Sequence, residues 1–244
     1  MSTPRAPRGR TRELERILSK LGLGSRVQAR EWIRAGRVMV NGRVVRDPSA
    51  WFVPEDSLIQ LDQQRADTKA PIYLALHKPR GVLTTRRDPE GRRTVYDLLG
   101  EHGGEWIAPV GRLDRDTSGL LLFTNDTAFA ELVTSPLSHV AKCYRVDVRP
   151  RLADAELERL RSGVVLEDGR THPAEVELVH AHGPTMRLLI TIDEGQNRQV
   201  RRMIRAVGSK VQQLVRISIG PLELGELASG HWRELKARDR KSVV

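Results

Sequence analysis

The chain has 244 residues, enough for one large domain or two unequal ones, and its 39% of hydrophobic residues argues against wholesale disorder. A net charge of +10, from 41 Lys and Arg against 31 Asp and Glu, indicates a polyanionic partner: RNA, DNA or an acidic membrane surface. The lone Cys143 excludes an internal disulfide framework and a Cys-rich metal site. The sequence has no apolar run long enough for a transmembrane helix, and its N-terminus lacks the apolar segment of a secretory signal. We therefore expect a cytoplasmic, monomeric protein that binds nucleic acid and does not associate with a membrane.

The positive charge is concentrated in two stretches. Residues 1–46 hold 12 Lys or Arg and 3 acids, a charge of +9, and residues 195–220 hold 6 Lys or Arg and no acid. Two basic stretches far apart in sequence are typical of two surfaces that bind one nucleic acid. Two solvated faces with a basic tail are the alternative interpretation.

A small helical module is predicted after a basic arm at residues 1–10. Apolar residues recur with helical spacing over Leu14–Leu21, which predicts a first helix. Thr11 is its expected N-cap, and Gly22 or Gly24 its expected end.

A second helix and a hairpin are predicted to complete this module. Ser25 and Gln28 have the spacing of a capping box, and the helix that they begin should stop at Gly36. Asn41-Gly42 lies between two β-prone runs in residues 38–45, which is a strong hairpin signal because both turn positions need a positive φ.

A second domain is predicted after a polar tether at residues 62–69. We therefore expect domains at residues 11–61 and 71–238. The second domain mixes strands and helices without the regular alternation of a parallel sheet, which indicates an α+β domain with a mixed, largely antiparallel sheet. Strands are expected at 72–77, 175–179, 186–192 and 211–219, a loop at 78–81, and helices near 129–133 (capped by Asp126), at Asp154–Ser162 and near 200–207.

Four arginines follow Glu194 with helical spacing. Arg198, Arg201, Arg202 and Arg205 fall within about a third of a helix circumference, and apolar residues occupy the opposite side. Like charges at these spacings repel, so the stripe is easier to explain if it meets phosphates or a carboxylate. A solvated arginine face is the alternative.

The polar loop at residues 111–117 precedes an apolar strand and holds the strongest candidate for chemistry. Asp114 lies between Arg112 and Arg115. A carboxylate beside guanidinium groups stays ionised, so it can act as a base or a nucleophile at neutral pH. A turn or capping role is more common for such a residue, and Asp116 offers a second carboxylate for a glycosidase-like pair.

Several motifs resemble those of the pseudouridine synthases of the Rsu-type ribosomal RNA branch (the RsuA family). "GRLDRDTSGLLLFTND" (111–126) closely resembles the catalytic motif of that family. "SRVQAREWIRAGRVMVNGRVV" (25–45) resembles the S4-like RNA-binding domain, the expected partner of this branch. "EGQNRQVRRM" favours the large-subunit enzymes of the branch. The flanking motifs "HKPRGVLTT", "GRRTVYDLL", "AKCYRVDV", "EGQNRQVRRMIRAVG" and "LVRISIGPLELGELASGHWREL" follow in the family order, and the likeness spans about residues 12 to 236.

The resemblance implies isomerisation of uridine to pseudouridine in ribosomal RNA, with large-subunit 23S rRNA as the expected substrate and with no cofactor and no metal. It implies that Asp114 is the essential aspartate, as nucleophile or proton abstractor. It implies that Tyr144 stacks on the uracil, and that Arg201 pairs with Asp114 and holds it ionised. The seven histidines are expected to be scattered, with packing or solvent roles.

RNA contacts are expected in both domains, with ribosomal RNA or a ribosomal precursor particle as partner. A non-catalytic RNA-binding ribosome-assembly factor, and a hydrolase of a glycosidic bond that uses Asp114 and Asp116, are the alternative functions. The candidate RNA-binding residues are Arg26, Arg30, Arg34 and Arg37 in the first domain, and Arg112, Arg198, Arg202 and Arg205 in the second.

Overall fold

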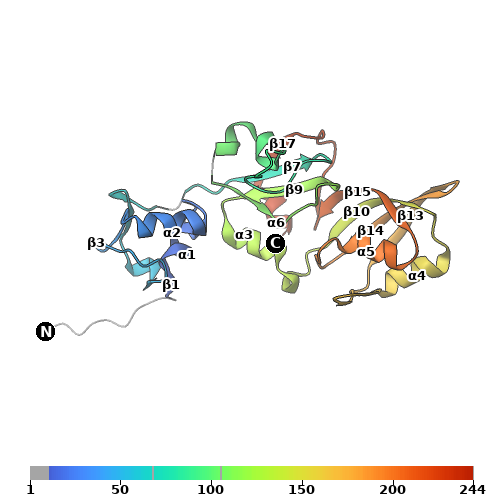
Figure 1. Cartoon of the computed structure of the whole chain (residues 1–244), viewed down its shortest axis with the longest axis horizontal. Helices are drawn as coiled ribbons and strands as arrows, with labels where there is room; N and C mark the ends of the chain where they lie inside the picture. The colour runs from blue at the N-terminus through green and yellow to red at the C-terminus, as the bar shows by residue number, and fades with distance from the viewer. Residues whose placement is uncertain (1–10, 68, 105, 244) are drawn as a thin grey trace. The chain divides into compact units, whose positions relative to one another are not determined.

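The computed structural model describes residues 11–67, 69–104 and 106–243, and the chain divides into two compact units (Figure 1). The first unit runs to Ile72 and includes residues 106–108 and 125–128; the second holds the remainder from Tyr73 onward. Within the described ranges, none of the helices has the length and apolar character needed to cross a bilayer.

The first unit begins with the expected helix, although its start differs from the prediction. Helix α1 (Leu14–Lys20) buries Leu14, Ile17 and Leu18 in a core of aliphatic side chains. Thr11 is not its N-cap, because β1 (Arg12–Glu13) pairs with β4 (Trp51–Phe52) and makes Glu13 the last extended residue. The pairing of a short strand has overridden the local capping preference.

The second helix, α2 (Arg26–Arg34), has the predicted capping box. Ser25 Oγ accepts a hydrogen bond from the Gln28 backbone N–H at 3.0 Å, and Gln28 Oε1 accepts one from the Ser25 N–H at 3.0 Å. The chain leaves the helix at Gly36, whose φ is +75°. The first turn and the last turn of α2 are thus both defined by the local sequence.

A four-stranded sheet in the order β3-β2-β5-β6 follows α2 in the first unit. Asn41 and Gly42 have φ of 51° and 78°, which confirms the predicted hairpin turn. The prediction of a tether at residues 62–69 is wrong over Gln64–Arg65, because Asp62 and Gln63 make a second tight turn with positive φ. The strands are β2 (Val38–Val40), β3 (Arg43–Val44), β5 (Ile59–Leu61) and β6 (Gln64–Arg65), and a 3-10 turn, η1, covers Pro54–Asp56.

The second unit is built on a sheet of nine described strands whose main path is β13-β14-β10-β15-β9-β7-β17. Along this path β9 and β15 are parallel and the other pairings are antiparallel, so the expected mixed, largely antiparallel sheet is confirmed. The strands are β7 (Tyr73–Lys78), β8 (Ala108–Val110), β9 (Ser118–Thr124), β10 (Lys142–Arg149), β13 (Glu175–His182), β14 (Thr185–Ile192), β15 (Lys210–Ile219), β16 (Leu222–Glu223) and β17 (Trp232–Glu234).

Helices pack on this sheet through the predicted apolar residues. Val200, Met203 and Ile204 of α5 (Gln199–Ala206) are buried in one cluster with side chains of β10 and β14. Helix α4 (Asp154–Ser162) has the predicted bounds, and Asp126 accepts from the Ala128 N–H at 2.9 Å before α3, as expected. The other described helices are α3 (Thr127–Thr134), α6 (Ala237–Val243) and the 3-10 turns η2 (Val95–Leu98), η3 (Gly100–Gly104) and η4 (Pro136–Ser138), and β11 (Val165–Leu166) pairs with β12 (Gly169–Arg170).

Gly119 sets how closely the two parallel strands approach. It lies opposite Arg216 in the β9–β15 register and has a φ of +111°. A Cβ atom at this position would lie 2.2 Å from the Arg216 carbonyl oxygen, so a larger residue would push the strands apart. The glycine of the motif therefore fixes β15 against the strand that follows the Asp114 loop.

Candidate active site

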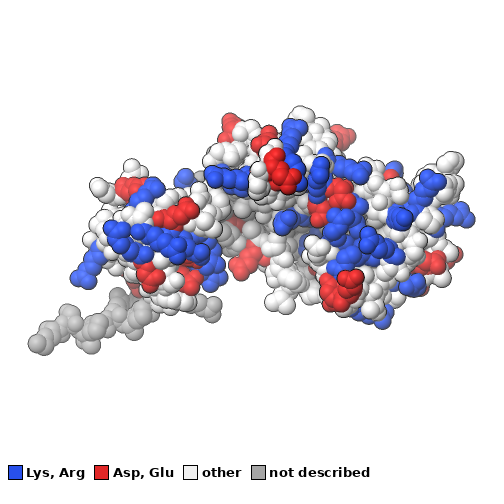
Figure 2. All heavy atoms as spheres, viewed as in Figure 1, with Lys and Arg blue, Asp and Glu red and all other residues white. Residues whose placement is uncertain are grey.

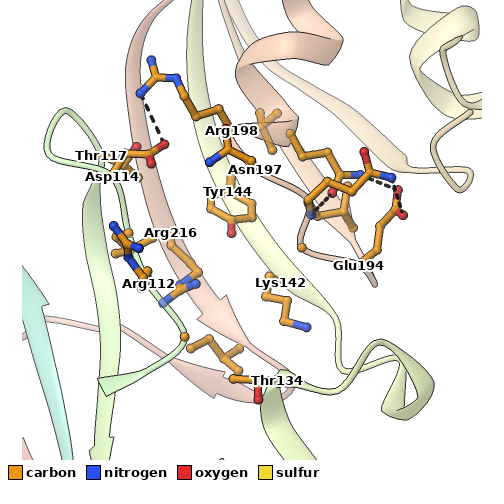
Figure 3. A pocket seen from close by; sticks show the side chains of 18 of the residues that line it. Arg112, Asp114, Thr117, Thr134, Lys142, Tyr144, Glu194, Asn197, Arg198 and Arg216 are labelled. Atoms are coloured by element: carbon orange, nitrogen blue, oxygen red, sulfur yellow. Dashed lines mark hydrogen bonds and ion pairs between the residues drawn. The ribbon is translucent and has the colours of Figure 1, made fainter. Parts of the chain in front are cut away.

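A pocket of about 780 Å³ lies within the second unit and brings together residues distant in the sequence (Figure 3). Its walls come from the loop at 110–117, the strands β10 and β15, and the loop at 192–198. Asp114, Tyr144, Arg112 and Arg198, which were singled out from the sequence, all line it. The walls also include Lys142, Glu194 and Arg216, which the sequence analysis did not select as site residues.

The backbone of the Asp114 loop is held from inside the domain by Lys78. Its ammonium group is fully buried and donates to the carbonyl oxygens of Asp114 (2.9 Å), Thr117 (2.8 Å) and Pro79 (3.2 Å). Burial lowers the pKa of Lys78 to about 8, against the opposing charges of Asp114 and Asp116. The predicted loop at 78–81 therefore begins with a buried anchor that its turn-like composition did not reveal.

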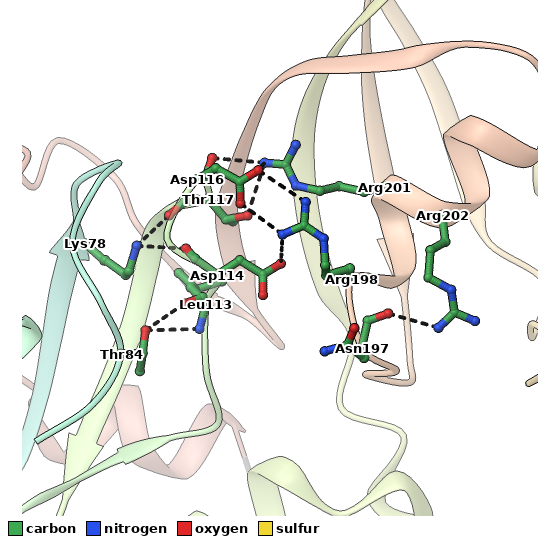
Figure 4. A network of polar contacts seen from close by, with 10 residues as sticks. All are labelled: Lys78, Thr84, Leu113, Asp114, Asp116, Thr117, Asn197, Arg198, Arg201 and Arg202. Atoms are coloured by element: carbon green, nitrogen blue, oxygen red, sulfur yellow. Dashed lines mark hydrogen bonds and ion pairs between the residues drawn. The ribbon is translucent and has the colours of Figure 1, made fainter. Parts of the chain in front are cut away.

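Thr84 holds the same loop on its other side. Its hydroxyl donates to the Leu113 carbonyl oxygen at 2.7 Å, and the two contacts from Lys78 and Thr84 flank Asp114 (Figure 4). The Thr117 N–H also donates to the Asp114 carbonyl oxygen at 3.1 Å. The loop is thus pre-organised, and the Asp114 side chain lines the pocket from a fixed backbone.

Two arginines meet the two carboxylates of the loop (Figure 4). Arg198 Nη1 lies 3.5 Å from Asp114 Oδ2 and 3.2 Å from Asp116 Oδ1, whereas Arg201 Nη2 lies 3.3 Å from Asp116 Oδ2. The expected pairing of Arg201 with Asp114 is therefore wrong, and Arg198 takes that place. The reason is that Arg198 is the N-cap of α5, with a φ of +48°, so its side chain leaves the arginine stripe and turns to the loop.

Arg201 contacts the loop behind Asp114. Its side chain is 14% exposed, and Nη2 donates to the Asp116 carbonyl oxygen at 2.9 Å and lies 3.4 Å from Thr117 Oγ1. Burial lowers the pKa of Arg201, while the charge of Asp116 opposes this shift. Arg201 is a positioning residue in this arrangement, because it binds the turn that carries Asp114 rather than Asp114 itself.

Asp116 does not have the properties of a second catalytic carboxyl. Burial raises its pKa most, but the hydrogen bond from Arg198 and the charges of Arg201 and Arg198 together lower it below the ordinary value. A general acid of a glycosidase needs a raised pKa. The geometry therefore gives no support to a hydrolase with Asp114 and Asp116 as its pair.

Tyr144 lies on β10 opposite Arg216 of β15, next to a register shift between Cys143 and Tyr144. Figure 3 places its ring in the pocket, with Asp114 and Arg198 above it and Arg216 and Lys142 below it in that view. The neighbouring Cys143 is half-buried. The ring of Tyr144 is thus available for a planar group that enters the pocket.

Glu194 organises the loop that delivers Arg198. Its side chain is buried and accepts hydrogen bonds from the His172 backbone N–H (2.9 Å), from Gln196 Nε2 (3.3 Å) and from Gln199 Nε2. The sequence analysis missed this residue; the signal was an acid at the end of a predicted buried strand, directly before the basic stretch.

The other arginines of the second unit differ in their surroundings. Arg202 donates to Asp168 and to the Asn197 carbonyl oxygen, the latter at 3.0 Å, and the hydrogen bond to Asp168 raises the pKa of Arg202. Arg205 is exposed, and Arg112 is exposed at the pocket. Arg201, Arg202 and Arg205 do not line the pocket. RNA binding by the arginines of this group stays a prediction.

The arginines of the first unit surround a buried acid. Glu15 is 4% exposed and pairs with Arg26 and with Arg30, whose Nε lies 2.8 Å from Glu15 Oε2. The hydrogen bond from Arg30 lowers the pKa of Glu15, against burial. Arg37 pairs with Asp62 at 2.5 Å, and Arg34 is exposed. Figure 2 shows the resulting band of basic side chains across the visible face of this unit.

Three side chains form a cluster that the sequence analysis did not foresee. Asp193 accepts from His139 Nδ1 at 2.7 Å and from His172 Nδ1 at 2.9 Å, so the expectation that all histidines are scattered is wrong for these two. The possible ligand atoms of His139, His172 and Asp193 lie within 4.8 Å of one another and could hold a divalent cation. The sheet brings together three loops that are distant in sequence, which spacing alone could not show.

Comparisons with known proteins identify the family of the chain. A family model described as RNA pseudouridylate synthase matches residues 72–206, and the S4 domain model matches residues 13–50. An uncharacterized RNA pseudouridine synthase of Aquifex aeolicus is 38% identical over 223 residues, 91% of this chain and 89% of that protein.

Two further similarities cover nearly the whole chain. Ribosomal large subunit pseudouridine synthase B of Bacillus subtilis is 37% identical over 232 residues, 94% of each chain. A crystal structure of a pseudouridylate synthase is similar with a TM-score of 0.70 at 29% identity, over 95% of this chain and 99% of that one.

Proposed function

The chain belongs to the RsuA family of RNA pseudouridine synthases and carries an N-terminal S4 domain, and from that membership we propose that it modifies a uridine of large-subunit ribosomal RNA. The enzyme is an intramolecular isomerase that acts on RNA. The name of the Bacillus subtilis relative, and that of an Escherichia coli relative at 38% identity over 91% of this chain, support the large ribosomal subunit as the source of the substrate.

The reaction changes the bond between base and sugar without changing the mass of the RNA. The C1′–N1 bond of uridine breaks, the uracil turns, and a C1′–C5 bond forms while C5 loses a proton and N1 gains one. We propose that Asp114 starts this sequence, as a nucleophile or as a proton abstractor. The observation that carries the proposal is the single pocket in which the Asp114 carboxylate, the Tyr144 ring and the Arg198 guanidinium meet.

The neighbours of Asp114 have separate roles in this proposal. Arg198 orients the carboxylate through their 3.5 Å contact, and Lys78 and Arg201 fix the loop from behind. Tyr144 stacks on the uracil and assists loss of the C5 proton. These residues supply orientation and charge for a reaction that needs neither a redox step nor a nucleotide.

The target uracil has to leave its stack to reach Asp114. Flipping a base costs a few kcal/mol, and less in a single-stranded loop. Phosphate contacts offset this cost, and the exposed Arg34 of the first unit and Arg112 of the second are suited to make them. We therefore propose looped ribosomal RNA, or a precursor particle that presents it, as the substrate.

The proposal is tested with unmodified 23S rRNA transcripts and pseudouridine mapping by carbodiimide-dependent primer-extension stops. The wild-type protein should produce one new stop, and Asp114→Asn should lower the rate by at least about 10³-fold while RNA binding persists. Asp154→Asn, an exposed acid on α4, is the matched control. Equal product from wild type and Asp114→Asn would remove Asp114 from its role. Binding without product from wild type, on naked RNA and on assembly intermediates, would favour the assembly-factor alternative.

A further inference from the structure

Arg216 is a buried cation whose hydrogen-bonding capacity is only partly used within the described structure. It is 5% exposed, and it lines the pocket that holds Asp114 and Tyr144. Its Nε donates to the Leu120 carbonyl oxygen at 2.8 Å, but its buried Nη2 has no partner among the described residues. A buried donor without an acceptor is costly, and in a native protein it points to a ligand that completes it.

The backbone around Arg216 is fixed before any ligand binds. Arg216 lies opposite Gly119 in the parallel β9–β15 pairing, where the missing Cβ allows the two backbones into close contact. The Nε of Arg216 donates to the carbonyl oxygen of Leu120, the residue that follows Gly119 on β9. The guanidinium is therefore anchored to the strand that directly follows the Asp114 loop, and its free edge is pre-organised.

Lys142 is a second cation in the same pocket. It lies on β10, two residues before Tyr144, and its ammonium has no hydrogen-bond or ion-pair partner among the described residues. Burial and the charge of Arg216 lower its pKa, against the charge of Asp193. The acids of the pocket wall are already engaged, since Glu194 is bound by Gln196 and Gln199 and Asp114 by Arg198. Asp193 accepts from His139 and His172, so among the described residues no acid forms an ion pair with Lys142 or Arg216.

We propose that Arg216 and Lys142 form a subsite for a carbonyl oxygen of the target uracil, and that they stabilise the negative charge that this oxygen gains during the reaction. The inference rests on the proposed role of Asp114. If the C1′–N1 bond breaks first, its electron pair stays on N1 and is shared with O2 and O4 of the uracil. If Asp114 instead adds to C6, the charge passes through C5 to O4. Both routes place negative charge on a uracil oxygen, and both end with a proton lost from C5 and one gained at N1.

The depth of the subsite favours the base over the RNA backbone as its occupant. Arg216 is almost completely buried, and in Figure 3 its guanidinium lies below the level of the Tyr144 ring, whereas Asp114 lies above it. A flipped uracil that stacks on Tyr144 is the part of the nucleotide that penetrates deepest, while its phosphates stay near the surface. Donors fixed at the position where charge develops lower the barrier more than donors that must reorganise.

The experiment measures single-turnover formation of pseudouridine at saturating RNA for Lys142→Met and Arg216→Lys. Each variant should react about 10²-fold more slowly, while its Kd for RNA stays within about twofold of wild type. Lys210→Met, which removes the same charge from an exposed position on β15 outside the pocket, is the control. Lys142→Met keeps the test valid if Arg216→Lys fails to fold, which circular dichroism reports.

Two kinetic outcomes would overturn the proposal. Unchanged single-turnover rates in Lys142→Met and in folded Arg216→Lys would show that neither cation acts on the reacting base. Unchanged rates with weaker RNA binding and a flatter salt dependence would assign the two cations to a backbone phosphate instead.

A binding measurement separates this proposal from the choice of ribosomal RNA as substrate. 5-Nitrouracil is an anion at neutral pH and mimics the charged base, whereas uracil is neutral. Wild type should bind 5-nitrouracil at least about tenfold more tightly than uracil, and Lys142→Met should lose this preference. Equal binding of the two bases, or no binding of 5-nitrouracil, would overturn the subsite. An inactive wild type with the expected 5-nitrouracil preference would contradict only the ribosomal RNA substrate.

Discussion

The two basic regions of the molecule pair arginines with acids in opposite ways. In the first unit the acid is inside: Glu15 is 4% exposed, while the side chains of Arg26 and Arg30 are 51% and 42% exposed. In the second unit the arrangement is reversed for one pair: the Arg201 side chain is 14% exposed and that of its partner Asp116 is 35% exposed. Arg198, at 44%, remains more exposed than its partner Asp114, at 34%. The first unit therefore presents exposed arginines over a buried acid, whereas the second holds half-buried carboxylates between one buried and one exposed arginine.

This inversion matches two different tasks. An exposed guanidinium tied to a buried carboxylate is held in place but can still meet a phosphate. A half-buried carboxylate whose loop is fixed by a buried guanidinium and a buried ammonium group is held in place and can still meet a reacting atom. The number of ion pairs in a region therefore does not indicate what that region binds. The exposed partner of each pair is the one that can contact a ligand.

The largest effect is expected from Arg201, the buried arginine of the second unit. Arg201→Met removes the bonds to the Asp116 carbonyl oxygen and to Thr117, so the Asp114 loop should lose its register. We expect kcat to fall about 10²-fold with little change in the Kd for RNA, because a small misplacement of a reacting group is costly. Single-turnover kinetics at saturating RNA check this. Arg159→Met on α4, exposed and outside the pocket, is the control, and a loss confined to RNA affinity would contradict the assigned role.

A smaller effect is expected from the buried acid of the first unit. Glu15→Gln should lower the free energy of unfolding at pH 7 by about 1 kcal/mol, because two half-exposed arginines lose their shared acceptor. Since the hydrogen bond from Arg30 lowers the pKa of Glu15 below 4.5, the unfolded chain takes up a proton at a higher pH than the folded chain. The stabilisation is thus present above pH 4.5 and is lost as the pH falls through the folded pKa.

Urea denaturation of wild type and Glu15→Gln across this pH range measures the effect. The two proteins should converge in stability at low pH. Glu13→Gln, whose side chain is 28% exposed and 3.4 Å from Arg26, should differ less from wild type. A constant difference between wild type and Glu15→Gln at every pH would contradict the electrostatic origin.

The smallest effect is expected from Arg34, which is exposed on α2 and has no ion-pair partner among the described residues. Arg34→Gln should raise the Kd for RNA about threefold and reduce the slope of log K against log salt by about 0.7, the value for one lost contact to single-stranded RNA. Thermal stability and kcat should not change. Salt-dependent binding titrations measure the slope, and an unchanged slope would show that α2 does not face the RNA through Arg34.

The local sequence determined those helices and turns whose ends are marked by capping or turn-forming residues. Ser25 and Gln28 cap α2, Asn41-Gly42 makes the first hairpin, and Asp154–Ser162 has the predicted bounds, because these features depend on neighbouring residues alone. The motif around Asp114 likewise predicted the residue at the centre of the pocket, because the sequence that forms a pre-organised loop is continuous.

Tertiary structure alone decided which distant groups meet. No local signal distinguishes Arg198 from Arg201 as the partner of Asp114, because the choice depends on the left-handed backbone of Arg198 and on the place where α5 begins. The burial of Lys78 under the Asp114 loop and of Arg216 beside Tyr144 has the same origin. Hydrogen bonding along a helix or through a turn is local, whereas burial and ion pairing depend on which strands the sheet places side by side.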